Sequence, residues 1–499
     1  MGGAAERAPG GIEAMTRRGA RRRIGLLTCG TLLLAGCGSA EPDPGPSSPA
    51  GPAPATSRSF APGAAGAGDA YFPSYGNGGY DVAHYTVKVR YDPETDKLSG
   101  TTTLRATATA DLSAFNLDLA GLTVRSVTVD GTAARHSRTE DELVITPAIG
   151  LTSGNGFTAE IRYDGRPEAL RTEALGEGGW LHTVDGAIAL GQPESASTWF
   201  PVNDHPSDKA TYDMEITVPK GLTAVSNGVP KGKATSGAWT TWKWSETAPA
   251  ASYLTTVAIG KFRVTTGQHK GRPVYSAVTT QVAQGAPDRS VARTVEVADY
   301  LESVFGPYPF DSYGGVVIAD ERIRYALETQ SRPVYSASFF RQGDNTGVVA
   351  HELAHQWYGN SVSIQRWQDI WLNEGLATYA EWLWAEHSGS TTVQRMFEQR
   401  YANAGGQVWR TPPGKPGVAN LFSRSVYDRG GMTVHALRVA VGDTAFFTIL
   451  RTWAAERKNG NATTADFVAL AERISGKKLA KVFDPWLYGT ERPPAPKPL

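Results

Sequence analysis

The sequence predicts a multidomain α+β protein, with an antiparallel β-sandwich or saddle followed by a mostly helical domain. Two observations lead to this prediction. Between about residues 71 and 260, short runs that alternate apolar and polar residues are separated by turn residues. After residue 260 the apolar residues recur at helical spacing instead. With 499 residues, of which 40% are hydrophobic, the chain is long enough to bury more than one core.

The first 37 residues are typical of a signal peptide. Arginines clustered at 17–23 precede the mostly apolar stretch 24–36, which is too short to span a bilayer. The stretch ends in Leu34-Ala35-Gly36-Cys37, which resembles the bacterial lipobox that is cut before a lipid-modified cysteine. We therefore expect an exported bacterial lipoprotein, translocated by the Sec or the twin-arginine route. Its lipid on Cys37 would anchor it to the cell membrane, outside the cytoplasm.

The region after the lipobox is predicted to be a tether. Residues 38–70 are rich in Pro, Ala, Gly and Ser, a composition typical of flexible linkers. Of the two cysteines, Cys29 lies within the leader, so Cys37 would be the single cysteine of the mature chain. A disulfide within the mature chain is then excluded.

The β-rich domain is predicted over residues 71–260. The pattern predicts strands at 84–91, 126–129, 157–163, 212–218 and 252–259. The second of these runs is followed by Asp130-Gly131, a pair typical of a tight hairpin turn. Regular spacing of short strands and turns favours an antiparallel arrangement.

The helical domain is predicted over residues 261–495. It would contain a short buried strand at 316–319 and a helix that carries His351 and His355, with Val348, Val349, Leu353, Trp357 and Tyr358 as its apolar surround and Gly359 as its stop. Further helices are predicted at 291–305, 371–387, 431–441, 445–456 and 464–474.

The motif His351-Glu352-Leu353-Ala354-His355 predicts a metal site. Two histidines four residues apart lie on the same face of a helix, so both imidazoles can reach one ion. Glu374 follows His355 after eighteen intervening residues, on a second apolar helix. Two histidines and one glutamate, with the fourth position open to water, are the ligand pattern of catalytic zinc. We therefore expect one Zn²⁺ per chain, bound by His351, His355 and Glu374.

The residue types around this ion predict a hydrolase. Zinc in such a site makes hydroxide available near neutral pH. Glu352 is placed to accept a proton from water and to pass it to the leaving amine. Attack on a peptide carbonyl also creates an oxyanion, which needs a fixed hydrogen-bond donor.

The run from Val349 to Asn360, together with Trp371 to Gly375, resembles the aminopeptidase N family of gluzincin metallopeptidases. The resemblance extends over roughly residues 75–490. It implies a thermolysin-like catalytic domain and a zinc-dependent aminopeptidase, which hydrolyses the N-terminal peptide bond by metal-activated water. In this family a tyrosine beyond the glutamate ligand donates to the oxyanion. The segment Ser425–Gly431 resembles that region and implies this role for Tyr427.

The same resemblance implies how a substrate amine is held. Glu328 matches the amine-binding glutamate of the family, although Tyr325 stands where the family has a glycine. Glu194 matches a second amine ligand from the β-rich domain. Two carboxylates on a protonated amine would place only the first peptide bond at the zinc, so we expect peptides with a free N-terminus as substrates.

Zinc-binding histidines are usually oriented by a further carboxylate. Glu381, two turns after Glu374 on the same helix face, or Asp369, which precedes that helix, would do this. The alternative is that each is a solvated charge on the helix surface.

Other functions remain open on the sequence alone. They are a catalytically inactive homologue that binds peptides, an endopeptidase, and an epoxide hydrolase like the related leukotriene hydrolases. The 49 basic and 49 acidic residues balance to zero, which does not favour a nucleic-acid partner. We expect a monomer. Members of the family often carry further domains that close over the site, so without them we expect an open cleft that tolerates longer peptides.

Overall fold

The computed structural model describes residues 58–172 and 175–497. The predicted signal peptide, 1–37, and residues 38–57 of the predicted tether lie outside this range. Within the described ranges, the model contains no helix with the length and apolar character needed to cross a membrane.

The prediction of a tether up to residue 70 is wrong for its last part. Residues from Arg58 onward belong to the same compact unit as the rest of the described chain. Strand β1 (Ala61–Pro62) pairs with β4 (Leu112–Asp118), and Asp69 is buried. Composition predicted a linker because the segment has few apolar residues, whereas backbone pairing and one buried carboxylate hold it in place.

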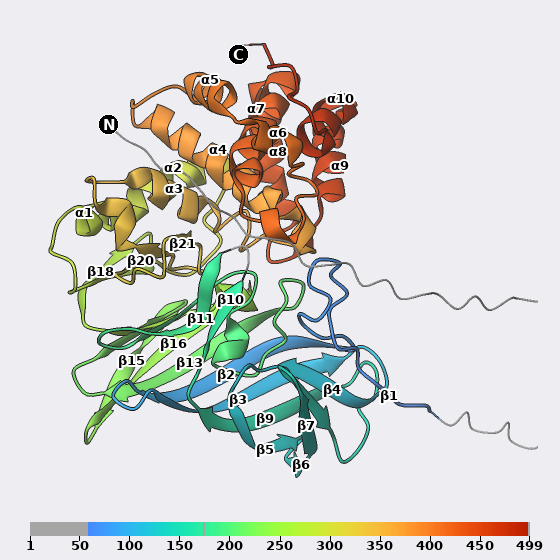
Figure 1. Cartoon of the computed structure of the whole chain (residues 1–499), viewed down its shortest axis with the longest axis vertical. Helices are drawn as coiled ribbons and strands as arrows, with labels where there is room; N and C mark the ends of the chain where they lie inside the picture. Colours follow the sequence, from blue (N-terminus) through green and yellow to red (C-terminus); the bar gives the residue numbers. More distant parts are fainter. Residues whose placement is uncertain (1–57, 173–174, 498–499) are drawn as a thin grey trace, which may run out of the picture. The chain divides into compact units, whose positions relative to one another are not determined.

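The largest sheet has eight strands in the order β15-β16-β13-β2-β3-β9-β5-β6 (Figure 1). Neighbouring strands are antiparallel except for β13 and β2, which are parallel. The bounds are β2 Tyr80–Asp92, β3 Lys97–Ala108, β5 Thr123–Val129, β6 Thr132–Ala133, β9 Gly156–Gly165, β13 Lys209–Pro219, β15 Val229–Ser236 and β16 Trp239–Ala251. One face of these strands is buried and the other exposed, as the alternating pattern predicts. Asp130 and Gly131, both with positive φ, form the predicted turn between β5 and β6.

Smaller sheets complete the β-rich part. One consists of β1, β4, β8 (Glu142–Thr146) and β7 (Arg135–Thr139). Another consists of β10 (Ala169–Thr172), β11 (Gly176–His182), β12 (Ala187–Leu190), β17 (Val257–Gly260) and β14 (Thr223–Ser226). The predicted strand 252–259 is only half correct, because Ser252–Leu254 form a 3₁₀ turn before β17. The carbonyl of Leu254 accepts bonds from Asn227 and Gln330, distant partners that no local pattern reveals.

A mixed sheet follows residue 260 and precedes most of the helices. Its order is β18 (Phe262–His269), β19 (Arg272–Thr279), β20 (Tyr313–Ile318), β22 (Val334–Ser336) and β21 (Ala326–Leu327), and a two-stranded sheet joins β23 (Ser363–Ile364) to β24 (Asn461–Ala462). The helices are α1 Ala286–Ala292, α2 Thr294–Phe305, α3 Thr346–Ala354, α4 Trp371–His387, α5 Val393–Asn403, α6 Gly406–Arg410, α7 Gly430–Val441, α8 Asp443–Glu456, α9 Thr464–Ser475 and α10 Ala480–Phe483. The predicted helix 291–305 is divided in two at Arg293.

Two hydrophobic cores support this architecture, and the predicted fold class is confirmed. The first lies among the sheets of the β-rich part and also takes in Val316 and Leu327 from the sheet beyond residue 260. The second is formed mainly by the helices and includes Val349 and Leu353 of α3. Glu328 directly follows Leu327, so it is held where the two cores meet.

Candidate metal and catalytic site

The motif lies at the contact between α3 and α4. Helix α3 begins at a true cap, where the side chain of Asn345 accepts a hydrogen bond from the N–H of Val348 at 3.2 Å. His351 and Glu352 lie in its last turn, and His355 follows directly after its end at Ala354. The helix is thus shorter than the prediction, which extended it to Tyr358. Glu374 lies in the first turn of α4, and both helices bury these side chains.

Helix α7 approaches α4 closely through two glycines. A Cβ atom on Gly375 would lie 2.8 Å from the carbonyl carbon of Gly430, closer than side-chain atoms approach a backbone. The absence of both side chains therefore lets the two backbones touch. This contact brings the π-helical turn Ser425–Arg429, which carries Tyr427, against the helix of Glu374.

The donor atoms of His351, His355 and Glu374 lie close together. Nε2 of His351 is 3.3 Å and Nε2 of His355 is 3.4 Å from the same oxygen, Oε2 of Glu374. Zinc bonds of about 2.1 Å in a tetrahedron separate neighbouring ligand atoms by about 3.4 Å. The three predicted ligands are therefore brought together at the spacing that zinc requires, and all three are buried.

The second nitrogen of each imidazole has an acceptor of its own. Nδ1 of His351 lies 2.6 Å from Oε1 of Glu381, and Nδ1 of His355 lies 3.1 Å from the carbonyl oxygen of Tyr358. These acceptors favour the tautomer with the proton on Nδ1, which would leave each Nε2 lone pair available to a metal ion. The structure thus places Glu381, but not Asp369, beside a ligand histidine. Asp369 instead accepts hydrogen bonds from the N–H and O–H of Thr464, the first residue of α9.

Charges at the site favour a cation. Burial raises the pKa of Glu374, but the charges and hydrogen bonds of the two histidines outweigh it and lower the pKa to about 2. Burial lowers the pKa of His355, yet the carboxylates of Glu328 and Glu374 reverse this and raise it to about 9. Without an ion the imidazoles would take up protons, and a bound divalent cation would replace that positive charge.

Glu352 lies next to the three donors with one free oxygen. Its Oε2 is buried and has no hydrogen-bond partner among the described residues. Burial raises the pKa of this carboxyl group to about 8. A buried acceptor without a partner is costly, so its presence here indicates a group that receives a proton or a ligand.

Tyr427 and Glu328 close the site from two other sides. The ring of Tyr427 lies over the His351 imidazole with centroids 5.9 Å apart and planes 22° apart, and burial raises the pKa of its hydroxyl. Oε1 of Glu328 accepts hydrogen bonds from Nε2 of Gln192 at 2.8 Å and from the hydroxyl of Tyr253 at 3.2 Å. The backbone carbonyl of Glu328 accepts a bond of 2.6 Å from Asn360, which follows the motif.

The comparisons with known proteins agree with this geometry. Residues 82–254 match the Peptidase M1 N-terminal domain, and residues 291–486 match the Peptidase family M1 domain. A solved M1 zinc metallopeptidase from Deinococcus radiodurans is 30% identical, with a TM-score of 0.79 over 87% of this chain and 99% of that one. This chain belongs to the M1 peptidase family. The resemblance to aminopeptidase N and its relatives is therefore confirmed.

Curated M1 relatives are longer. Aminopeptidase M1-D of rice (Oryza sativa subsp. japonica) is 27% identical over 439 residues, which are 81% of this chain and 49% of the relative. Human glutamyl aminopeptidase is 27% identical over 324 residues, or 59% of this chain and 33% of the relative. This M1 chain thus spans between about a third and about half of the length of the curated relatives it matches. A further structure of the Deinococcus protein, of equal similarity, holds a Tyr-Ser-Ala substrate.

The site of this M1 chain lies in a cavity of about 450 Å³, and most of the predicted site residues line it. Glu194 is an exception, and its prediction needs correction. Its carboxyl group lies beside Tyr75, Ser197 and Asp204, and the cavity is lined by Gln192 instead. The two residues flank Pro193, and only the one that reaches Glu328 faces the site. The sequence Gln192-Pro193-Glu194 places both candidates side by side, and a family pattern of two carboxylates selects the acidic one.

Side chains that the sequence did not single out complete the cavity wall. Phe339 and Phe422 supply aromatic surface, and Arg324 is the one Lys or Arg among the seventeen lining residues. Tyr325, where the family has a glycine, also lines the cavity, and its hydroxyl is 3.5 Å from the carbonyl of Glu177 in β11. These residues come from separate loops, so no local spacing could have grouped them.

Proposed function

We propose that this M1 peptidase is a zinc-dependent aminopeptidase that hydrolyses the N-terminal peptide bond of peptides by metal-activated water. The observation that carries the proposal is the buried His351, His355 and Glu374 donor set, with the free oxygen of Glu352 next to it. The aminopeptidase activity named for its relatives, and the tripeptide held by the Deinococcus protein, support the same reaction.

The proposed chemistry divides among residues of this chain. When bound, zinc supplies positive charge that favours ionisation of water and polarises a carbonyl group. Burial favours the protonated form of Glu352, and the positive charge of a bound cation beside it would favour the ionised form. The ionised Glu352 accepts the proton of the attacking water through its free oxygen and later returns it to the leaving amine. The hydroxyl of Tyr427 donates to the carbonyl oxygen as that oxygen becomes negative. Glu381 and the Tyr358 carbonyl keep the two imidazoles in their binding orientation.

Glu328 makes the site an exopeptidase in this proposal. Its carboxylate receives the protonated α-amine of the substrate, while Gln192 and Tyr253 hold that carboxylate in position. Gln192 takes the place where a second carboxylate was expected, so the amine would meet one negative charge rather than two. The amine and the first peptide bond then occupy fixed places relative to Glu352.

A pair of matched peptides tests this proposal. The free-amine peptide should be cut from its N-terminus, and the activity should disappear with a chelator and return with Zn²⁺. The N-acetylated form of the same peptide should be a poor substrate, because it carries no amine charge for Glu328. Equal cleavage of both peptides would indicate an endopeptidase, and no cleavage by zinc-loaded protein would indicate an inactive peptide-binding homologue.

We also propose that the protein is an exported, lipid-anchored monomer. The support for export and anchoring is the sequence alone: the arginines at 17–23, the apolar stretch 24–36 and the lipobox ending at Cys37. In cells, the wild type should sediment with membranes and Cys37→Ala should not. Light scattering of the tag-purified Cys37→Ala protein should give the mass of one chain. Equal membrane association of both proteins would overturn the anchor.

A further inference from the structure

The exposed face of the eight-stranded sheet carries a pocket of about 580 Å³ whose residues are not shared with the candidate active site. Four basic side chains line it, namely Arg90, Lys97, Arg125 and Arg166, all of them exposed. Two carboxylates, those of Asp92 and Asp164, accompany them. The pocket therefore has an excess of positive charge, although the whole chain is formally neutral.

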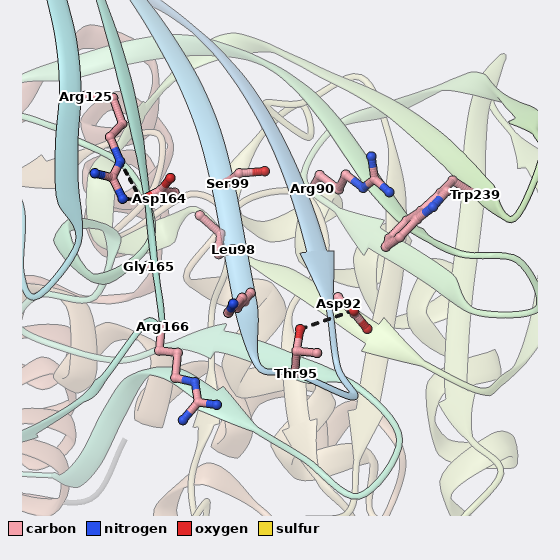
Figure 2. Close-up of a pocket in the computed structure, with 11 residues that line it drawn as sticks. Arg90, Asp92, Thr95, Leu98, Ser99, Arg125, Asp164, Gly165, Arg166 and Trp239 are labelled. Carbon is pink, nitrogen blue, oxygen red and sulfur yellow. Dashed lines mark hydrogen bonds and ion pairs between the residues drawn. The ribbon is translucent and has the colours of Figure 1, made fainter.

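The strand register builds the floor of this pocket. Arg90 of β2 lies opposite Ser99 of β3, and Ser99 lies opposite Asp164 of β9. Residues directly opposite one another on antiparallel strands point to the same face. Figure 2 shows the Arg90–Trp239 pair on one side of the pocket and Arg125 with Asp164 on the other. The sheet thus fixes the spacing between these charges.

Arg90 is prepared to bind an anion. Its guanidinium lies 3.6 Å above the ring centroid of Trp239, a stacking contact that restrains the side chain. Stacking uses the flat face of the guanidinium and leaves the N–H groups at its edge free. Those edges are the part that pairs with carboxylate or phosphate oxygens.

The two carboxylates do not neutralise the other cations. Asp164 is held by Arg125, whose Nη2 lies 2.7 Å from Oδ1. Asp92 accepts hydrogen bonds within its own hairpin, from the hydroxyl of Thr95 at 3.1 Å and from the N–H of Glu94. Within residues 58–172 and 175–497, no carboxylate lies at ion-pair distance from Arg90, Lys97 or Arg166. Three separated positive charges thus face one concave surface without partners.

We infer that this pocket binds an acidic oligosaccharide, a sugar chain that carries carboxylate or phosphate groups at intervals. Separated cations match separated anionic groups better than they match a single ion. The hydroxyls of Thr95 and Ser99 and the carboxylate of Asp92 suit hydrogen bonds to sugar hydroxyls. A neighbouring concavity of about 300 Å³ shares Arg90 and Ser99, which extends the surface for a chain-like ligand.

The lining favours this ligand over two other polyanions. Single-stranded nucleic acid is bound by several aromatic side chains in series, and the pocket offers Trp239 alone. An anionic membrane also attracts basic side chains, but a stable contact with a membrane surface adds apolar side chains that insert among the lipids. The large apolar side chains that are exposed within the described ranges, such as Phe60, Ile149 and Val184, do not line the pocket.

Binding of a labelled oligogalacturonate, measured by fluorescence anisotropy, tests the inference. The protein should bind this acidic chain but not a neutral maltooligosaccharide, and added salt should weaken the binding. Arg90→Glu and Arg166→Glu should each reduce the affinity about tenfold or more, because each removes a charge-assisted bond and adds repulsion. Arg105→Glu is the matched control, since Arg105 is exposed on β3 of the same sheet but lies outside the pocket.

The inference does not rest on the proposed peptidase activity. Urea unfolding should give the same midpoint for all three variants and the wild type, which shows that they are folded whether or not the protein is a peptidase. Absence of binding by the wild type, or equal loss in Arg90→Glu and Arg105→Glu, would overturn the inference. So would tighter binding to an oligodeoxythymidine or to anionic vesicles, or displacement of the sugar by orthophosphate at equally low concentration.

Discussion

Glu352 is the residue on which the proposed reaction most directly depends. Replacement by Gln keeps the shape of the side chain but removes the group that accepts a proton. We expect kcat for an aminoacyl p-nitroanilide to fall by about 10²- to 10⁴-fold. Zinc content, measured by elemental analysis, should stay at one ion per chain, because none of the three donors is changed. Glu398→Gln, on the outer side of α5, serves as the control. Full activity of Glu352→Gln would exclude its role as the base.

Glu381 and Asp369 give opposite expectations for zinc affinity. Glu381→Gln replaces the charged acceptor 2.6 Å from Nδ1 of His351, and zinc should bind about 10- to 100-fold more weakly. Asp369→Asn should leave zinc affinity unchanged, since Asp369 bonds Thr464 and no ligand histidine. Competition with a fluorescent zinc chelator measures both. A loss of affinity in Asp369→Asn, or none in Glu381→Gln, contradicts this assignment.

Residue types at fixed spacing were the most predictable part of the site. Residues four apart on a helix lie on the same face at a fixed distance, so the relative positions of His351, Glu352 and His355 can be predicted from the sequence. The sequence does not decide between Glu194 and Gln192 as the residue in the site. That depends on which of the two side chains flanking Pro193 reaches Glu328, a residue far away in the sequence. Arg324, Phe339 and Phe422 were missed for the same reason, as loops from separate parts of the chain bring them together.

At the scale of elements, the contact between α4 and α7 sets the position of Tyr427 relative to Glu374. Gly375→Ala would place a Cβ atom 2.8 Å from the backbone of Gly430, and the helices would have to separate. We expect the free energy of unfolding to fall by about 1–3 kcal/mol, as in other overpacked cores. The kcat should fall as well, since Tyr427 moves with the start of α7.

Gly347→Ala is the matched control for this substitution. Gly347 lies in α3, and a Cβ atom there would be 3.4 Å from its nearest neighbour. Because alanine favours helix more than glycine does, this variant should unfold at an equal or higher urea concentration. If Gly375→Ala were as stable as Gly347→Ala, the close approach of the helices would not be needed.

Elements with a regular period were predicted well, and their ends were not. Strands such as β9 follow one repeat over their whole length, and the 17-residue helix α4 is recognised by its long apolar run, which is buried over most of its length. The break at Arg293 and the 3₁₀ turn at Ser252–Leu254 fall within apolar runs, where a repeat alone cannot mark an end. At the 3₁₀ turn the carbonyl of Leu254 bonds to Asn227, a distant partner, whereas the backbone of Arg293 bonds locally to Ser290 and Val297.

At the scale of the whole molecule, Asp69 links three parts of the chain. Its Oδ1 accepts from the N–H of Tyr71 at 2.7 Å, and its Oδ2 from the N–H of Trp367 at 2.8 Å. Nε2 of His205 lies 3.4 Å from the same Oδ2. Residue 69 thus holds the segment before β2 to the β-rich part and to the loop before α4. The composition of this segment does not reveal that it is ordered, because its attachment depends on the hydrogen bonds of one buried carboxylate and not on apolar residues.

The pKa of Asp69 gives this link a pH dependence. Burial raises the pKa, but the hydrogen bonds from His205, Trp367 and Tyr71 outweigh it and lower the pKa below the ordinary 3.8. Above pH 3.8 the carboxylate is ionised in both states, so its contribution to stability is fully present. As the pH falls from 3.8 through the lower folded pKa, the unfolded chain binds the proton first, and the contribution is lost.

Asp69→Asn should therefore be less stable than the wild type near neutral pH, by about 1–3 kcal/mol, because an amide N–H₂ replaces one charged acceptor. The difference should shrink as the pH falls below 3.8, since protonated Asp69 also loses its charge. Urea unfolding of both proteins across this range measures it, with Glu491→Gln as the exposed control. A difference that stays constant with pH would mean that Asp69 acts through its shape alone, and that its charge does not join the three parts of the chain.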